Sequence, residues 1–203
     1  MNLSENLKQK CLKALVAILG LLVVCLAVYI FIFPFYPEIE YQFLLRVQGF
    51  SRAANQTVSS AQMLPVSENL DLGNRLIIPK ISVDTPIVDS QNSVWALNHG
   101  AWRMPQTSTP NKGSNTAIAG HRFKYLPPNN LTFYLLDKLV VGDGVAIVWE
   151  GKEYDYRVTD NKIVPPTEVS VLAPTEKPTL TLITCDPIFS QKNRLVVTAE
   201  LIN

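Results

Sequence analysis

The segment from Ala14 to Pro37 constrains this chain more than any other, because it contains no charged residue and is mostly Leu, Val, Ile and Phe. A helix rises about 1.5 Å per residue, so about 20 such residues cross the roughly 30 Å hydrocarbon core of a bilayer. Only 17% of the 203 residues are charged, below the roughly 25% of an average soluble domain. We therefore predict one transmembrane helix over Ala14–Phe35, with the lipid bilayer as a partner of the chain.

The charges on the two sides of this segment differ in sign. The N-terminal flank carries Lys8, Lys10 and Lys13, whereas the C-terminal flank carries Glu38 and Glu40. Basic residues are retained preferentially on the cytoplasmic side of a membrane. The pattern predicts a single-pass plasma-membrane protein with residues 1–13 in the cytoplasm and everything after about Pro37 outside the cell.

A cleaved signal peptide is the alternative interpretation of the apolar segment. Its apolar region would measure about 7 to 15 residues and end in small residues at the cleavage site. The present segment is longer and ends in Phe33-Pro34-Phe35-Tyr36-Pro37. The sequence therefore favours a retained anchor.

The amino-acid composition changes twice after the anchor. Residues 36–74 mix apolar and polar positions and then become rich in Ala, Asn, Gln, Ser and Thr, which is typical of a juxtamembrane segment followed by a tether. From residue 75 to residue 203, short β-branched runs alternate with Pro, Gly, Asn and Asp, which indicates an all-β barrel or sandwich. The predicted strands are Leu76–Ile78, Thr85–Val88, Thr116–Ala119, Gly144–Trp149, Tyr154–Thr159, Lys162–Val164, Thr179–Thr184 and Arg194–Leu201. Glu150-Gly151-Lys152 is expected to close a hairpin.

The overall charge gives no reason to expect nucleic acid as a partner. The formal net charge is +1 and the isoelectric point is about 7.7. Domains that bind phosphate backbones usually show a clustered basic face and a high isoelectric point. We predict no nucleic-acid partner.

Three cysteines are present, and their positions separate them. Cys11 precedes the apolar segment, Cys25 lies within it, and Cys185 lies in the β-rich part. Cys11 and Cys25 are about 21 Å apart along one helix, too far for a disulfide. Cys185 is therefore a lone thiol in an exported domain, either buried as a small apolar side chain or used chemically.

The surroundings of Cys185 in the sequence suit a nucleophile. The alternating strand Thr179–Thr184 delivers it at its end, followed by Asp186-Pro187, where proline stops strand pairing. A catalytic thiol needs a base or a cation nearby. The β-rich part offers His121, which follows a predicted strand, and His99, which we leave unassigned. If the strands on either side of the loop after Cys185 are antiparallel neighbours, Arg194 returns beside the thiol.

Several strings together resemble the sortases, membrane-anchored cysteine transpeptidases of Gram-positive-type cell envelopes. They are Leu76-Ile77-Ile78-Pro79-Lys80-Ile81, Ala117-Ile118-Ala119-Gly120-His121-Arg122 and Thr181-Leu182-Ile183-Thr184-Cys185, with Arg194 downstream. The resemblance spans about residues 76 to 201. It implies a closed eight-stranded sortase-type β-barrel with short helices, preceded by the transmembrane helix.

The resemblance also implies a reaction. Cys185 would cleave a C-terminal sorting signal of the LPxTG or LAxTG type between Thr and Gly through a thioacyl intermediate. An amine from a peptidoglycan precursor or a pilin lysine would then resolve that intermediate. His121 would act as general acid and base, and Arg194 would bind the substrate carbonyl or oxyanion.

Within the family, Thr184-Cys185-Asp186-Pro187 and the ending Arg194–Leu201 look most similar to class E sortases. A pilus-polymerising enzyme is an alternative, although we see no Asp-Pro-aromatic lid upstream of His121. An L,D-transpeptidase is disfavoured, because its Ser-x-Gly-Cys-x-Arg string does not match. A non-enzymatic, membrane-tethered β-domain with an inert Cys185 is the remaining alternative.

The loop of about residues 161–178 is where the family holds the sorting signal. Val169, Val171 and Leu172 are therefore candidate wall residues, together with Thr184 beside the nucleophile, although burial in the core would explain them equally well. The acidic loop residues Glu168 and Glu176 are typical of solvated loops. We predict no metal and no cofactor.

Overall fold

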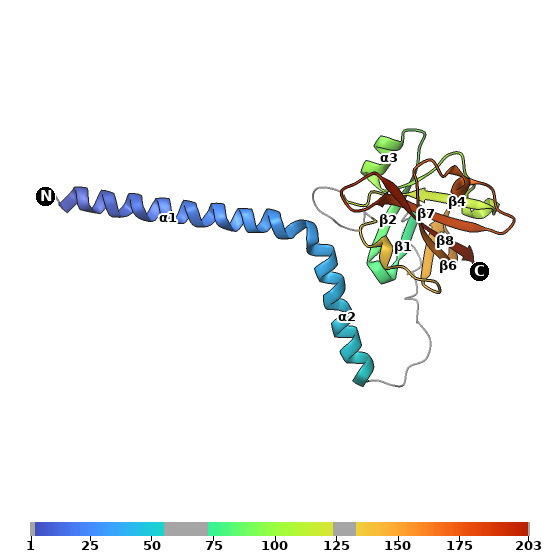
Figure 1. Cartoon of the computed structure of the whole chain (residues 1–203), viewed down its shortest axis with the longest axis horizontal. Helices are drawn as coiled ribbons and strands as arrows, with labels where there is room; N and C mark the ends of the chain where they lie inside the picture. The colour runs from blue at the N-terminus through green and yellow to red at the C-terminus, as the bar shows by residue number, and fades with distance from the viewer. Residues whose placement is uncertain (1–2, 55–72, 124–132, 203) are drawn as a thin grey trace. The chain divides into compact units, whose positions relative to one another are not determined.

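A computed structural model describes residues 3–54, 73–123 and 133–202. The chain divides into two compact units, residues 1–43 and residues 44–203. The first consists of helices and the second contains the β-structure (Figure 1).

The N-terminal unit contains α1 (Leu3–Ile32), which includes most of the predicted membrane span. The large apolar side chains between Leu12 and Ile32 are exposed, and among the described residues this is the one helical stretch long and apolar enough to cross a membrane. A 3-10 turn, η1 (Phe33–Phe35), follows and ends the helix three residues before the predicted boundary. Pro34 accounts for this end, because proline cannot donate the helical hydrogen bond and its ring clashes with the preceding turn.

A second helix, α2 (Tyr36–Ala54), carries Pro37 in its first turn, where proline is tolerated. This helix covers the first half of residues 36–74, where the sequence predicts a juxtamembrane segment. The predicted tether falls largely in residues 55–72, outside the described residues.

The second unit is a closed barrel of eight strands, as predicted. The strands are β1 (Arg75–Ile78), β2 (Val83–Asp89), β3 (Ala101–Arg103), β4 (Asn115–Ala119), β5 (Gly144–Trp149), β6 (Lys152–Val164), β7 (Thr179–Asp186) and β8 (Asn193–Leu201). Their order around the barrel is β1-β2-β3-β4-β7-β8-β6-β5. The short helices are α3 (Ser93–His99), η2 (Pro79–Ile81), η3 (Pro110–Lys112), η4 (Leu136–Lys138) and η5 (Val169–Leu172).

The predicted hairpin is confirmed between β5 and β6, whose pairing reaches Trp149 and Lys152. The two turn residues, Glu150 and Gly151, have φ angles of 50° and 76°. Positive φ at both central positions is the geometry of a type I′ turn, whose twist matches that of the flanking strands.

Two strand predictions were wrong in detail. Tyr154–Thr159 and Lys162–Val164 are one strand, β6, because a bulge between Val158 and Asp160 lets its pairing with β8 continue across the polar residues. The three-residue strand β3 was missed, because it is too short to show a period of two. It runs parallel to β2, from which it is separated by the crossover through α3.

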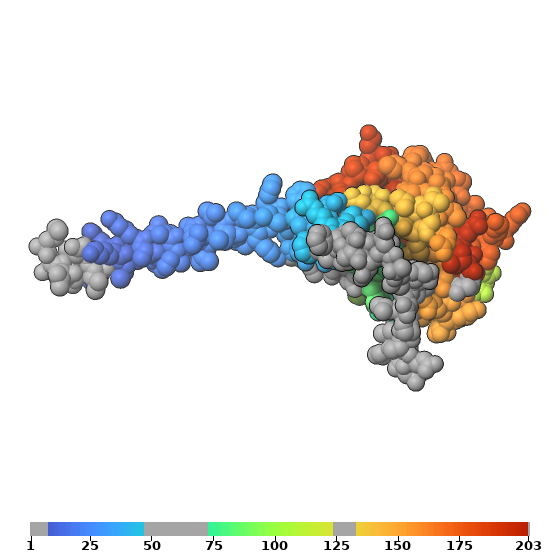
Figure 2. Space-filling model, turned by 90° about the horizontal axis from the view of Figure 1, so that it is seen from below, coloured from blue at the N-terminus to red at the C-terminus, as the bar shows by residue number. Residues whose placement is uncertain are grey.

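The barrel interior is filled by side chains from all around the sheet. Its largest fully buried residues include Leu76, Ile78, Ile118, Phe133, Leu136, Ile147, Tyr156, Leu180 and Leu182. In the space-filling view, the yellow and orange part of this face belongs to the segment that runs from Phe133 through β6 into the loop after it (Figure 2). Strand ends at the rim of this closed, packed sheet are rigid positions from which a side chain can face a cavity.

Candidate active site

Cys185 lies near the C-terminal end of β7 and is partly exposed. Strand β8 runs antiparallel to β7, and the register places Cys185 directly opposite Arg194. The expected return of Arg194 beside the thiol is therefore confirmed. Residues directly opposite in an antiparallel pair have Cβ atoms about 4.5–5.5 Å apart, so the two side chains are neighbours.

His121 follows β4, which runs parallel to β7 on the other side from β8. The ladder ends with Ala119 opposite Ile183, and the Gly120 amide donates to the Ile183 carbonyl at 3.0 Å. Continuing this register brings His121 level with Cys185. The two side chains of the predicted acid–base and nucleophile pair thus leave adjacent strands at one end of the barrel.

Two contacts hold the backbone on either side of His121. The hydroxyl of Thr184, which is 2% exposed, donates to the Gly120 carbonyl at 2.8 Å, and the Phe133 amide donates to the His121 carbonyl at 2.6 Å. Gly120 is required here, because a Cβ would lie 2.8 Å from the Phe133 ring. These contacts fix the point at which the chain leaves the sheet with His121.

Arg194 is fixed by its own loop. Its Nη1 donates to the carbonyl of Gln191 at 3.1 Å and to the carbonyl of Asn193 at 2.9 Å. A planar guanidinium held in this way is pre-oriented, which reduces the entropy lost when it binds a further oxygen.

Cys185, His121 and Arg194 all line a first cavity of about 340 Å³. Its other walls are largely apolar and come from β3, the end of β4 and the loop between β6 and β7. The predicted wall residues Val169, Val171 and Leu172 all line this cavity. The predicted loop begins later than expected, because residues 161–164 belong to β6.

The loop carrying these apolar walls is held by a buried amide. The Nδ2 of Asn115, 3% exposed, donates to the carbonyls of Val171 and Ala173 at 2.9 and 3.0 Å. Its Oδ1 accepts the hydroxyl hydrogen of Thr181 at 2.8 Å. Val171 and Leu172 also pack against the buried residues Ala117, Ile183 and Val196. Val171 and Leu172 therefore both pack against the core and line the cavity.

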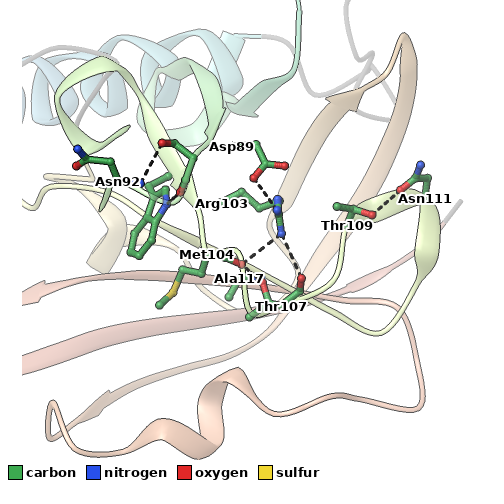
Figure 3. A network of polar contacts seen from close by, with 10 residues as sticks. Asp89, Asn92, Arg103, Met104, Thr107, Thr109, Asn111 and Ala117 are labelled. Atoms are coloured by element: carbon green, nitrogen blue, oxygen red, sulfur yellow. Dashed lines mark hydrogen bonds and ion pairs between the residues drawn. The ribbon is translucent and has the colours of Figure 1, made fainter. Parts of the chain in front are cut away.

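A second buried group, Arg103, holds the turn after β3. Arg103 donates to Asp89 at 2.6 Å and to the carbonyls of Met104 and Thr107 at 3.3 and 3.2 Å (Figure 3). The Thr107 hydroxyl accepts the Ala117 amide hydrogen at 3.1 Å. This network fixes the turn after β3, which presents Met104 to the first cavity. Sequence reasoning missed two residues of this cavity, Trp102 and Met104, because Trp102 lies in the unrecognised strand β3 and Met104 directly follows it.

A second cavity, of about 310 Å³, meets the first at Cys185. The two cavities share His121, Cys185 and Gln191. The second is otherwise lined by Arg122, Phe123, Phe189 and Ser190, and the two phenylalanine rings pack edge to face at 4.8 Å. Sequence reasoning missed this cavity, although its residues flank His121 and Cys185 directly in the chain.

The remaining candidates have other positions. His99 lies at the end of α3, where its ring stacks on Trp95 at 4.2 Å and its Nδ1 lies 2.7 Å from the Trp95 carbonyl oxygen. It lines neither cavity.

Thr184 lines the first cavity, but its hydroxyl is bonded to the barrel backbone. Glu168 lines the first cavity and accepts from the Ser170 hydroxyl. Among the described residues, no group of three or more His, Cys, Asp or Glu has the arrangement of a metal site.

Comparison with known proteins gives this arrangement a family. A family profile described as the sortase domain matches residues 76–202. The chain belongs to the sortase family. The curated Sortase SrtE1 of Streptomyces coelicolor is 30% identical over 142 residues, which cover 63% of this chain and 39% of that protein. Sortase A of Bacillus anthracis is 30% identical over 128 residues, which cover 63% of this chain and 59% of that protein. The match thus spans about half the length of these curated relatives.

Solved sortase structures share the barrel. Sortase E1 of Streptomyces coelicolor, solved with a tripeptide in its active site, gives a TM-score of 0.56 at 28% identity and covers 64% of this chain and 88% of that chain. A Clostridium perfringens Sortase D5 transpeptidase gives 0.56 at 30% identity, with coverages of 64% and 78%. The expected sortase fold and the similarity to class E are therefore confirmed.

Proposed function

We propose that this sortase is a membrane-anchored cysteine transpeptidase that uses Cys185 as its nucleophile. The observation that carries the proposal is the meeting of three side chains from adjacent strands β4, β7 and β8 at one cavity: His121, Cys185 and Arg194. A thiol beside an imidazole and a guanidinium has the acid–base partner and the oxyanion donor that acyl transfer requires. A partly exposed Cys185 also fits this role better than that of an inert core residue.

In the first half-reaction, the Cys185 thiolate attacks the carbonyl carbon of the Thr–Gly bond in an LPxTG or LAxTG sorting signal. The carbonyl π-electrons move to oxygen, and this oxyanion accepts hydrogen bonds from Arg194 and from the backbone N–H after Cys185. When the C–N bond breaks, His121 donates a proton to the leaving glycine amine. The product is a thioester between the Thr carbonyl and Cys185.

In the second half-reaction, an amine attacks the thioester carbonyl while His121 removes its proton. Collapse of the tetrahedral intermediate forms an amide and returns the thiolate. A peptidoglycan precursor or a pilin lysine would supply the amine. Two cavities that meet at the thiol suit a reaction with two substrates, because the acceptor can approach from a side that the acyl group does not fill.

The apolar walls of the first cavity suit the sorting signal. Val171 and Leu172, fixed through Asn115, offer contact area for the signal's Leu and Pro or Ala side chains. Val169 is 69% exposed and extends this wall toward solvent. We assign Thr184 to the support of this wall and of His121 through its bond to Gly120.

The anchor places these substrates within reach. The lysine-rich N-terminal flank supports a cytoplasmic N-terminus and a barrel outside the plasma membrane. Sorting-signal proteins and envelope amines are both available there, at the membrane surface. We propose the domain boundaries 1–13, 14–35, 36–74 and 75–203 for this arrangement.

The experiment uses the full chain in detergent micelles, with quenched-fluorescent Leu-Pro-x-Thr-Gly and Leu-Ala-x-Thr-Gly peptides and a primary amine. Mass spectrometry should detect an acyl group on Cys185 and an amine-dependent ligated peptide. Cys185→Ala should remove both, with a loss of more than about a thousandfold in rate. Cys25→Ala, a matched change of another free cysteine, should remove neither. Ligation by Cys185→Ala would overturn the proposal.

A further inference from the structure

The residues that follow the two central side chains also face each other. Arg122 comes directly after His121, and Asp186 comes directly after Cys185. The Nη1 of Arg122 lies 3.8 Å from the Oδ1 of Asp186, and its Nη2 donates to Asp137 at 2.8 Å. The parallel register that brings His121 level with Cys185 thus forms a second, charged pair one residue further along.

Arg122 is buried in a way that its hydrogen bonds do not explain. Its side chain is 6% exposed, and its Nε and Nη1 are buried without a hydrogen-bond partner. A buried cation is costly unless its surroundings offset its charge, and every unsatisfied buried donor requires an explanation. The two nearby carboxylates, on Asp137 and Asp186, supply the offset, and Asp137 is also within 3.4 Å of Lys138.

The negative charge of Asp186 would repel a thiolate on the neighbouring residue, Cys185. The Asp186 side chain is 18% exposed, and its Cα is one peptide unit, about 3.8 Å, from that of Cys185. Consecutive side chains of a strand leave its opposite faces, so the carboxylate acts on the thiol across β7. A like charge at short range disfavours the charged form of a group, and partial burial weakens the screening by water. Asp186 itself lines neither cavity; the titratable and charged side chains that line the two cavities at Cys185 are His121, Arg194, Glu168 and Arg122. Among the described residues, Arg122 is the cation that an ion pair joins to Asp186.

We infer that Arg122 is a positioning and charge-neutralising residue: it masks the Asp186 carboxylate and thereby permits the thiolate form of Cys185. Arg122 acts through Asp186 and need not touch the substrate. This inference rests on the proposed role of Cys185 as the nucleophile.

The test measures the rate at which iodoacetamide alkylates Cys185, because only the thiolate reacts and the reagent is neutral and independent of any sorting signal. Full-length wild type, Arg122→Gln, Asp186→Asn and the double variant are compared in detergent micelles at neutral pH. Peptide-resolved mass spectrometry separates Cys185 from Cys11 and Cys25. Thermal unfolding of each variant verifies that the barrel is folded.

We expect Arg122→Gln to slow alkylation roughly tenfold, because it leaves the Asp186 charge unmasked. Asp186→Asn should match or exceed the wild-type rate. The double variant should return to within about threefold of wild type. If Arg122 served only to bridge the strands, the double variant would stay as slow as Arg122→Gln, and that result would overturn the inference. A slow Asp186→Asn variant would overturn it as well.

Matched controls come from the opposite side of the barrel. Arg75 and Asp84 form an ion pair across β1 and β2, neither of which neighbours β7. Arg75→Gln and its double variant with Asp84→Asn should leave the alkylation rate of Cys185 unchanged within about twofold. If Arg75→Gln slows the reaction as much as Arg122→Gln, the effect is general destabilisation and the inference fails.

Peptide ligation by the same variants separates this inference from the proposed function. If wild type ligates no peptide while the alkylation pattern holds, the proposed function fails and the charge masking stands. If ligation proceeds and the four alkylation rates are equal, the masking fails alone. An Arg122→Lys variant adds a test that retains charge: it should keep more than half of the wild-type alkylation rate.

Discussion

The two cavities that meet at Cys185 differ in the chemistry of their walls. The first is formed by apolar side chains that also pack against the barrel core, such as Val171 and Leu172. The second is formed by chain segments that leave the sheet, with Arg122, Phe123 and Phe189. Walls that belong to the core are rigid and suit side-chain recognition, whereas the segments beyond the strand ends place both aromatic rings and polar groups, such as Arg122 and Ser190, beside the thiol. The difference supports a division of labour between acyl donor and acceptor.

Among these predictions, loss of His121 should reduce the reaction rates most, because this side chain lines both cavities. We expect His121→Ala to slow both half-reactions by roughly a thousandfold, because general acid–base catalysis contributes about 10²–10⁴. Single-turnover acylation and amine-dependent release from the thioester would be measured separately. His99→Ala is the control, since His99 lines neither cavity. A normal release rate in His121→Ala would show that the imidazole serves one side only.

Arg194 lines the first cavity and tests whether that side also holds the oxyanion. Removing one oxyanion donor costs about 10²–10³ in rate, so we expect Arg194→Ala to lower kcat for acylation by about a hundredfold. Arg194→Lys should recover little, because Nη1 of the guanidinium binds the Gln191 and Asn193 carbonyls while its other N–H groups stay available for the substrate, and a single ammonium nitrogen lacks this division. Full activity in either variant would remove Arg194 from the mechanism.

Two substitutions, one in the wall of each cavity, should show which substrate each cavity binds. We expect Leu172→Ala to raise KM for the sorting peptide about tenfold, because contact area is lost in the first cavity. Phe189→Ala should instead raise the amine concentration needed for half-maximal ligation, while leaving acylation unchanged within about twofold. Steady-state kinetics with both substrates varied would measure this. Equal effects of both changes on the peptide KM would contradict the proposed division.

The smallest expected effect is on stability at alkaline pH and comes from Tyr156, which lines neither cavity. Burial raises the pKa of Tyr156 above its ordinary value of 10.0, with a further contribution from Tyr154. The folded state therefore retains this proton where the unfolded state releases it, so stability is unaffected below about pH 10 and falls as pH rises above that value. Tyr156→Phe should remove this part of the alkaline loss. Thermal unfolding from pH 8 to pH 11 would measure it, and identical slopes for both proteins would contradict the assignment.

How much of the fold the sequence predicted depends on the length of each signal. The anchor and the hairpin between β5 and β6 were predicted because a long uncharged run and a two-residue Gly turn are local features. The merging of two segments into β6 was not predicted, because a bulge is tolerated only where a partner strand, here β8, supplies the hydrogen bonds. The strand β3 exists because β2 and β4 pair with it on either side.

The same division applies to the site. The sequence by itself determined the membrane-length apolar segment, the lone thiol at a strand end and the short strings that resemble those of sortases, because each segment or string is written in consecutive residues. Only the tertiary structure decided that Cys185 lies opposite Arg194, that β4 brings His121 level with the thiol, and that Arg122 meets Asp186. These contacts join residues more than 60 positions apart in two of the three cases, and a linear pattern does not encode the register of a closed sheet. Barrel closure selects that register, because only one alignment buries the apolar face of every strand.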